Sequence, residues 1–154
     1  MKGAVIYHAP AGDLLVEYDD GAVTALKNAC APLPEETPNA LTALVFEQLD
    51  AYFAGTRTAF DFPYRVHGTP FQEQVWAALR DIPYGETRTY KQIAEAIGRP
   101  KACRAVGMAN HSNPIFLVIP CHRVIGADGS LTGYGGGLAM KRALLELEAK
   151  NARK

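Results

Sequence analysis

The spacing of apolar residues changes once along this chain, and the change limits the folds open to it. Up to residue 26 the apolar residues form three short runs separated by turn-forming segments such as Asp19-Asp20-Gly21, a pattern typical of antiparallel strands. From Pro38 onward they recur at helical intervals instead. We therefore expect an α/β fold, in which a small N-terminal antiparallel sheet with a helix is followed by a mostly helical, winged-helix-like part. The strands are predicted at 4–7, 14–18 and 22–26.

Two amphipathic helices are predicted in the first half of the chain. The first follows Pro38 and ends at Gly55, and its apolar residues are Leu41, Leu44, Val45, Leu49, Tyr52 and Phe53. The second runs from about Pro70 to Asp81, with Trp76 on its buried face. Segment 58–69 between them lacks periodicity and is interpreted as a linker. The expected domains are therefore an N-terminal α/β domain, 1–66, and a mostly helical C-terminal domain, 67–154.

A helix-turn-helix is predicted at 90–97 and 101–110, with Thr87 or Thr89 as N-cap and Gly98-Arg99-Pro100 as the turn. The apolar contacts between the two helices are expected from Ile93, Ala94, Ile97, Ala102, Ala105, Val106 and Ala109. The second helix consists largely of small residues, and Arg99, Lys101 and Arg104 lie on or beside it. Small side chains and clustered positive charge favour insertion into a DNA groove over a solvated basic face.

The distribution of charge along the chain also favours a nucleic-acid interface in the region of the predicted helix-turn-helix. The formal net charge is zero, but residues 1–82 carry 5 Lys/Arg and 11 Asp/Glu, a net charge of −6, whereas residues 83–142 carry 8 and 3, a net charge of +5. A nucleic-acid partner is therefore expected at the C-terminal part of the chain.

The three cysteines are Cys30, Cys103 and Cys121, an odd number without paired spacing. We expect no disulfide framework, a reducing compartment and a cytoplasmic location, without a signal peptide, membrane span or membrane partner. Cys30, His8 and His67 are too few for a structural zinc site, so no metal is expected. Cys103 is interpreted as a tolerated small side chain.

Cys121 lies in the sequence Pro120-Cys121-His122-Arg123, directly after the apolar run 114–119. A nucleophilic cysteine needs its thiolate form, which neighbouring cations and bases favour, so Cys121 is predicted to be reactive rather than an inert buried thiol. We expect an apolar strand that starts at Pro114 and ends in a Pro-constrained turn that holds Cys121, His122 and Arg123, with adjacent side chains on opposite faces as on an extended segment. His122 then points away from the Cys121 sulfur and acts through a water molecule.

A carboxylate partner for His122 is sought on the helix predicted at 138–148, which follows the glycine-rich loop 126–137. Leu144, Leu145 and Leu147 are expected to face inward, and 149–154 to fray. Glu148 shares the inward face and can complete the relay. The alternative is a surface pair of Glu148 with Arg142 or Lys150, and the spacing leaves both open.

Over residues 45–148 the chain resembles the bacterial O6-alkylguanine-DNA alkyltransferases, or methylated-DNA:protein-cysteine methyltransferases. The matching segments are Gly68-Thr69-Pro70-Phe71-Gln72, Val75-Trp76, Ile82-Pro83-Tyr84-Gly85-Glu86-Thr87, Tyr90, Arg104-Ala105-Val106-Gly107, Ala109-Asn110, Asn113-Pro114, Ile119-Pro120-Cys121-His122-Arg123-Val124-Ile125, Gly133-Tyr134-Gly135-Gly136-Gly137-Leu138 and Lys141.

The resemblance implies DNA repair by direct reversal without a cofactor. A monomer would bind double-stranded DNA through the minor groove, flip out O6-alkylguanine, or possibly O4-alkylthymine, and transfer the alkyl group irreversibly to its own cysteine. The implied catalytic residues are Cys121 as acceptor, His122 as base, Glu148 as its carboxylate partner, Asn113 orienting the turn, and Tyr90 donating to the guanine ring. Arg104 is the implied finger that fills the gap in the duplex. The other implied DNA contacts are Tyr90, Lys101, Ala102, Ala105, Gly107 and Arg123, and the implied pocket is formed by Cys121, Val124, Tyr134, Gly135, Phe116 and Thr132.

Two other functions are considered. Alkyltransferase-like proteins that bind lesions without repairing them replace the acceptor cysteine, whereas Cys121 is present here. A thiol hydrolase with a Cys, His and Glu triad fits poorly with adjacent Cys and His residues beside a basic helix.

Overall fold

The protein is described from a computed structural model that covers residues 1–131, 134 and 137–152. Its N-terminal part is a three-stranded antiparallel sheet in the order β1-β2-β3. The strands are β1 (Lys2–Ala9), β2 (Gly12–Asp19) and β3 (Ala22–Asn28), which confirms the three predicted runs. Asp20 and Gly21 both have positive φ in the β2–β3 turn, the conformation that a tight two-residue hairpin requires.

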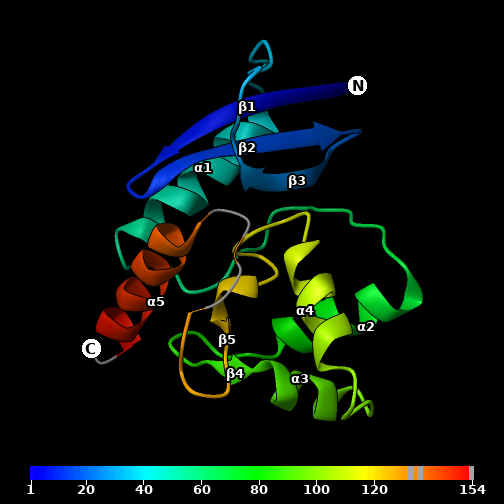
Figure 1. Ribbon diagram of the computed structural model, residues 1–154. Coiled ribbons are helices and arrows are strands. Elements are labelled where there is room, and N and C mark those ends of the chain that lie inside the picture. Colours follow the sequence, from blue (N-terminus) through cyan, green and yellow to red (C-terminus); the bar gives the residue numbers. More distant parts are fainter. Residues whose placement is uncertain (132–133, 135–136, 153–154) are drawn as a thin grey trace.

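Helix α1 (Ala40–Phe53) lies against the sheet (Figure 1). Val45, Leu49 and Tyr52 are buried as predicted, whereas Leu44 is exposed. Helix α2 (Pro70–Arg80) buries Trp76, whose indole nitrogen donates to the carbonyl of Ala109 at 2.9 Å. Both helices begin with a capping box, formed at Asn39 and at Thr69, which satisfies backbone N–H groups that a helix start leaves unpaired.

Segment 58–69, between α1 and α2, differs from the predicted linker. Phe62 is buried, and Tyr64 forms a bridge with Val23 of β3. The backbone N–H of Val23 donates to Pro63, and that of Arg65 donates to Val23. The segment therefore runs along the sheet edge, because its aromatic side chains bury apolar surface without needing a regular period.

The helix-turn-helix is confirmed. Strand β4 (Arg88–Thr89) leads into α3 (Tyr90–Ala96), which Thr89 caps, and α4 (Cys103–His111) follows the turn. Val106 and Ala109 of α4 are buried against the core, but Ala105 is exposed. Ala105 therefore faces outward, contrary to its predicted role in the contact between the helices.

The apolar run 114–119 was predicted as a strand and is instead a compact turn, whereas the turn predicted at Cys121, His122 and Arg123 is observed. Ile115 bridges to Leu26, Phe116 bridges to Ile119, and Leu117 between them has a φ of 72°. Residues Cys121–Arg123 form a single 3₁₀ turn, η1, before strand β5 (Val124–Ile125), which pairs with β4 in parallel. A continuous apolar run predicts that a segment is buried, but it does not predict the backbone conformation. This run is buried, and its backbone forms a turn.

Helix α5 (Leu138–Ala152) passes beside α1 (Figure 1). It continues beyond Glu148 to Ala152, so residues 149–152 are helical and not frayed as predicted. Leu144 is fully buried, while Leu145 and Leu147 are partly buried. One hydrophobic cluster joins the sheet, the helix-turn-helix and α5. Within the described residues, no helix is long and apolar enough to span a membrane.

Candidate active site

Glu148 lies in the interior and accepts hydrogen bonds from four residues in three parts of the chain. Its Oε2 atom is 2.6 Å from the Tyr52 hydroxyl of α1 and 2.6 Å from Nε2 of His122. Its Oε1 atom accepts from Nε of Arg123 at 2.7 Å and from the Gly85 N–H at 3.3 Å. The carboxylate is 1% exposed. The inward position of Glu148 is thus confirmed, and the surface pair is excluded.

The bond to Glu148 fixes the protonation state of His122. Burial alone would raise the pKa of Glu148, but the hydrogen bonds from His122 and Arg123 and the positive charge of Arg123 outweigh it and hold that pKa well below its usual range. An ionised carboxylate only accepts, so Nε2 of His122 carries the proton. Burial lowers the pKa of His122, against the pull of Glu148, which keeps the imidazole neutral with an unprotonated Nδ1. Nδ1 is buried and has no hydrogen-bond partner among the described residues.

Arg123 is buried, which differs from its predicted place at the DNA surface. Its Nη1 donates to the carbonyl of Ile82 at 2.8 Å, its Nε and Nη2 hold Glu148, and its guanidinium lies 5.7 Å from the centre of the Tyr84 ring. A guanidinium engaged in this way is not available to a phosphate. The structure therefore assigns Arg123 to holding Glu148 in place.

Asn113 ties together the turn that precedes Cys121. Its amide nitrogen donates to the Ile119 carbonyl at 2.7 Å, and its amide oxygen accepts from the Ile115 N–H at 2.9 Å. These bonds join the two ends of the turn, which is the arrangement that the expected orienting role of Asn113 requires. Burial raises the pKa of Cys121 to about 11, while a hydrogen bond from Asn113 and the charge of Lys141 act in the opposite direction.

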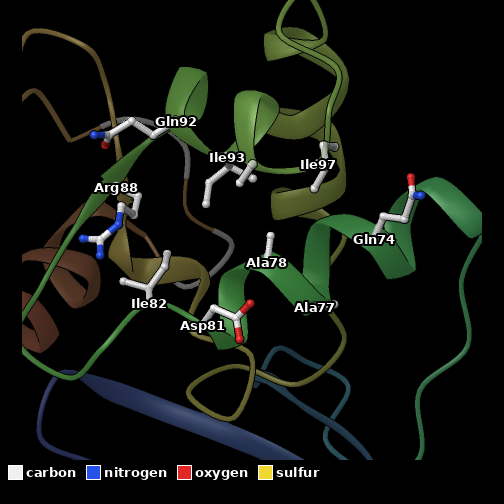
Figure 2. A pocket seen from close by; sticks show the side chains of 10 residues that line it. Gln74, Ala77, Ala78, Asp81, Ile82, Arg88, Gln92, Ile93 and Ile97 are labelled. Atoms are coloured by element: carbon white, nitrogen blue, oxygen red, sulfur yellow. The ribbon is translucent and has the colours of Figure 1, made fainter.

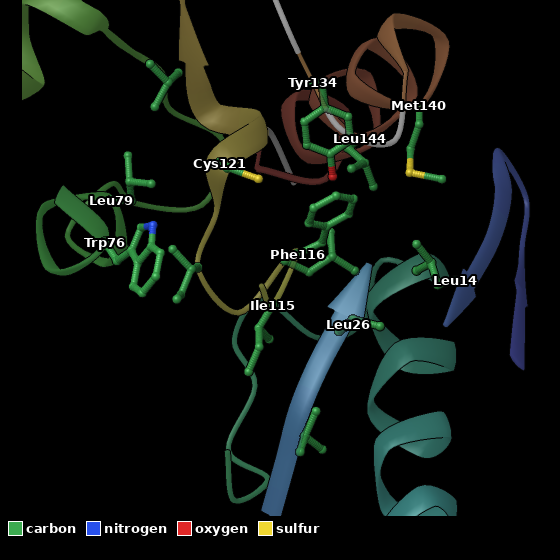
Figure 3. Packing of buried hydrophobic residues seen from close by; sticks show 14 of the residues in the cluster. Leu14, Leu26, Trp76, Leu79, Ile115, Phe116, Cys121, Tyr134, Met140 and Leu144 are labelled. Carbon is green, nitrogen blue, oxygen red and sulfur yellow. The ribbon is translucent and has the colours of Figure 1, made fainter. Parts of the chain in front are cut away.

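Two aromatic rings lie opposite the cysteine. Phe116 and Tyr134 are both buried, with ring centres 5.0 Å apart, and the Cys121 sulfur points toward them (Figure 3). An apolar wall beside the sulfur suits a flat base or an alkyl group. The two other predicted pocket residues, Gly135 and Thr132, lie outside the described residues.

The two backbone carbonyls expected to bind a base differ in their remaining capacity. The Cys121 carbonyl accepts from the Val124 N–H and from the Asn110 amide, the latter at 3.4 Å. The Val124 carbonyl accepts from Nζ of Lys141. A carbonyl oxygen has two lone pairs. Among the described residues, the Val124 carbonyl therefore keeps one lone pair for a ligand, whereas both lone pairs of the Cys121 carbonyl already accept hydrogen bonds.

The predicted DNA-binding residues lie on and around α4. Arg104, Lys101 and Ala105 are exposed, while Ala102 and Gly107 are partly exposed. Tyr90 begins α3, and a Cβ atom added at Gly107 would lie 3.8 Å from its ring. Met108 is 73% exposed on the same helix. The outward face of α4 therefore combines one long cation with small or apolar side chains, which suits a narrow groove.

A separate groove of 570 Å³ lies between α2 and α3 (Figure 2). Ala78, Ile82, Ile93, Asp81 and Arg88 are among the residues that line it. It contains no thiol or imidazole. In the part of the chain that the structure describes, no cluster of three or more His, Cys, Asp or Glu residues could hold a metal ion.

Three residues at the site were not predicted as site residues: Tyr52, Lys141 and Asn110. Tyr52 contributes its hydroxyl to Glu148 across 96 residues of sequence, and no local pattern indicates such a contact. Lys141 stands among the matching segments of the family resemblance but received no role. Lys141 is fully buried on the face of α5 that also carries Leu144 and Glu148, and helical periodicity could have indicated this position.

A family model, the DNA-binding domain of 6-O-methylguanine DNA methyltransferase, matches residues 70–150. A methylated-DNA–protein-cysteine methyltransferase of Mycobacterium bovis is 60% identical over 115 residues, covering 75% of this chain and 69% of the relative. One from Methanosarcina barkeri is 60% identical over 106 residues, covering 69% and 67%.

Solved structures resemble the whole fold. The crystal structure of Mycobacterium tuberculosis O6-methylguanine methyltransferase has a TM-score of 0.88 and 47% identity, and covers 98% of this chain and 94% of that one. The structure of Mycobacterium tuberculosis OGT in complex with DNA has a TM-score of 0.86 and 49% identity, covering 95% and 92%.

Proposed function

This chain belongs to the family of methylated-DNA–protein-cysteine methyltransferases, and from that premise we propose that Cys121 is its alkyl acceptor. The protein repairs DNA by alkyl transfer. The observation that carries the choice of Cys121 is its position between a buried His122–Glu148 pair and the Phe116–Tyr134 wall. The other two cysteines, Cys30 and Cys103, lie outside this arrangement.

The proposed reaction is a displacement at the carbon attached to O6 of guanine. A water molecule takes the proton of Cys121 to Nδ1 of His122, and the resulting imidazolium is stabilised by Glu148. The thiolate forms an S–C bond as the C–O6 bond breaks, and the electron pair leaves with the guanine. Tyr90 donates a hydrogen bond to the ring as this charge develops. The thioether product is stable, so each molecule reacts once.

DNA recognition is proposed to use α4 in the minor groove. The exposed Arg104 would enter the duplex and fill the space left by the flipped nucleotide, while Lys101, Ala102, Ala105 and Gly107 line the contact. An O6-alkyl group disrupts pairing with cytosine, which lowers the cost of flipping. Inside the pocket, the free lone pair of the Val124 carbonyl would accept from the exocyclic amine. We propose that the protein binds as a monomer and that residues 67–154 form the DNA-binding domain, a boundary that the family match over 70–150 supports.

Intact-mass measurement with peptide mapping tests the proposal directly. The protein is incubated with a duplex that carries one O6-methylguanine, and an identical duplex without the methyl group is the control. We expect one added methyl group per protein molecule, on the peptide that contains Cys121. An unmodified Cys121 in a reduced, DNA-bound protein would favour a lesion-binding protein instead.

A further inference from the structure

Asn110 places a polar side chain in the interior, between α4 and Cys121. It lies on the inward face of α4 and is 3% exposed. The residue before it, Ala109, is held by the Trp76 indole, which donates to its carbonyl at 2.9 Å. The amide nitrogen of Asn110 donates to the Cys121 carbonyl at 3.4 Å. The amide is therefore fixed against the first residue of the turn that carries the thiol.

The other polar atom of this amide, Oδ1, is buried and has no hydrogen-bond partner among the described residues. The orientation of the amide follows from its neighbour, because only the nitrogen can donate to the Cys121 carbonyl. An amide oxygen accepts and cannot donate. A buried acceptor without a donor destabilises the protein, so a ligand that brings an N–H group to Oδ1 would recover this loss.

Three other buried side-chain atoms of the described residues lack a partner: the hydroxyls of Tyr84 and Tyr134 and Nδ1 of His122. The two hydroxyls carry protons of their own and can donate as well as accept. Nδ1 of His122 is the proton acceptor of the proposed relay. Oδ1 of Asn110 thus differs from the other three, because it only accepts and the proposed reaction does not use it.

The exocyclic amine of guanine has two N–H groups and needs two acceptors in a buried pocket. Under the proposed function, the Val124 carbonyl accepts one of them. The Cys121 carbonyl already accepts from the Val124 N–H and from Asn110, so it has no lone pair for the second. Oδ1 of Asn110 belongs to the amide that occupies that lone pair, and it is the adjacent acceptor.

We propose that Asn110 is a specificity-determining residue whose Oδ1 accepts the second N–H of the guanine 2-amino group. The inference rests on the proposed function of Cys121. It replaces the expected pair of backbone carbonyls with one backbone carbonyl, at Val124, and one side chain. Hypoxanthine lacks only the 2-amino group of guanine, so O6-methylhypoxanthine leaves Oδ1 unpaired and is a poor substrate.

The experiment compares the rates of methyl transfer from O6-methylguanine and from O6-methylhypoxanthine. Each base is placed opposite an abasic site in the same duplex, so that neither has a pair to break, and the methylated Cys121 peptide is counted by mass. A neutral hydrogen bond changes a rate by up to about tenfold. With two bonds to the amine, the wild type should prefer O6-methylguanine by about 30- to 100-fold.

Asn110→Leu replaces the amide with a side chain of similar size, which still covers the Cys121 carbonyl but offers no acceptor. Its preference for O6-methylguanine should fall about tenfold, whereas its rate on O6-methylhypoxanthine should change little. Asn110→Asp retains an oxygen at the position of Oδ1, and its protonated carboxyl can donate to the Cys121 carbonyl, so it should keep the preference. Asn28→Ala, at an exposed asparagine, is the matched control and should keep the wild-type ratio.

The ratio of the two rates separates recognition from a purely structural role, because a general loss of activity lowers both rates equally. The proposal is overturned if Asn110→Leu keeps the wild-type ratio, or if Asn110→Asp loses the preference as Asn110→Leu does. If Asn110→Leu does not fold, as judged by circular dichroism, the wild-type ratio decides, since a preference below about tenfold requires no second acceptor. Failure of the proposed function is a separate outcome, seen as an unmethylated Cys121 after incubation of the wild type with O6-methylguanine DNA.

Discussion

Glu148 and Arg104 are both charged and are assigned to the same reaction, yet their surroundings are opposite. Glu148 is fully buried and accepts from Tyr52, Gly85, His122 and Arg123. Arg104 is exposed on α4, among small side chains. The charge of Glu148 is used in contacts that stabilise the fold, whereas the charge of Arg104 is available to a ligand. The protein thus separates a buried centre, where we propose the chemistry occurs, from an exposed surface that we propose recognises DNA.

The largest expected effect comes from removing the acceptor itself. Cys121→Ala should abolish alkyl transfer, because the S–C bond cannot form, while binding to lesion-containing DNA persists through α4. The measurement pairs methyl transfer by mass with a DNA-binding titration. Cys30→Ala, at an exposed cysteine, is the matched control and should transfer normally. Transfer by the Cys121→Ala protein would contradict the assignment.

Removing the charge of the buried Glu148 should lower the free energy of unfolding as well as the activity. Glu148→Gln leaves Arg123 buried without its charge partner, which typically costs about 3–5 kcal/mol. Urea unfolding measures this loss. Glu146→Gln, at an exposed position on the same helix, should change the free energy of unfolding by less than about 0.5 kcal/mol. Equal changes in the free energy of unfolding for Glu148→Gln and Glu146→Gln would contradict the structural role assigned to the buried carboxylate.

Acid should weaken the same centre without a mutation. The folded-state pKa of Glu148 is depressed by His122 and Arg123, so its contribution to stability is complete above about pH 4.3, the unfolded value, and is lost as pH falls toward the folded value. Guanidinium unfolding at a series of pH values below 5 measures the decline. The Glu148→Gln protein should show a shallower decline, and an identical slope would indicate that other carboxyl groups dominate.

The smallest expected effect lies on the recognition side. Arg104→Ala should keep the free energy of unfolding within about 0.5 kcal/mol of the wild type. It should weaken binding to lesion-containing DNA by about 1–2 kcal/mol and reduce the fluorescence change of a base analogue placed at the lesion. Arg99→Ala removes an equally exposed charge outside α4 and should leave the flipping signal intact. A loss of flipping in both variants would indicate a nonspecific effect of positive charge and not the insertion of the Arg104 side chain into the duplex.

The sequence predicted the parts of this fold that local rules control. Thr89, for example, caps α3 as expected, because the capping box needs only residues three apart. The placement of Glu148 remained open, since spacing alone gives the face of a helix and not its partner. Tyr52 was assigned only to the core for the same reason. Contacts between residues far apart in sequence depend on how the helices and strands pack. A short segment of sequence does not determine this packing.

The turn from Asn113 to Cys121 shows a different limit. Its apolar residues were read as a strand because the run is continuous, but the side chain of Asn113 supplies the bonds that a neighbouring strand would have made. Arg123 was expected to contact DNA because the family resemblance implied it. It is buried here because Glu148 compensates its charge, and that compensation is visible only in three dimensions.

The long reach of Glu148 also bears on the order of folding. Its bond to Tyr52 spans 96 residues and its bond to Gly85 spans 63, so the entropy of closing long loops must be overcome before these contacts form. We expect the carboxylate to join its partners late, after the hairpins and the helix-turn-helix have formed locally. An incompletely folded chain would then hold a cysteine without its relay and without the pocket for the base, and alkyl transfer would require the completed tertiary structure.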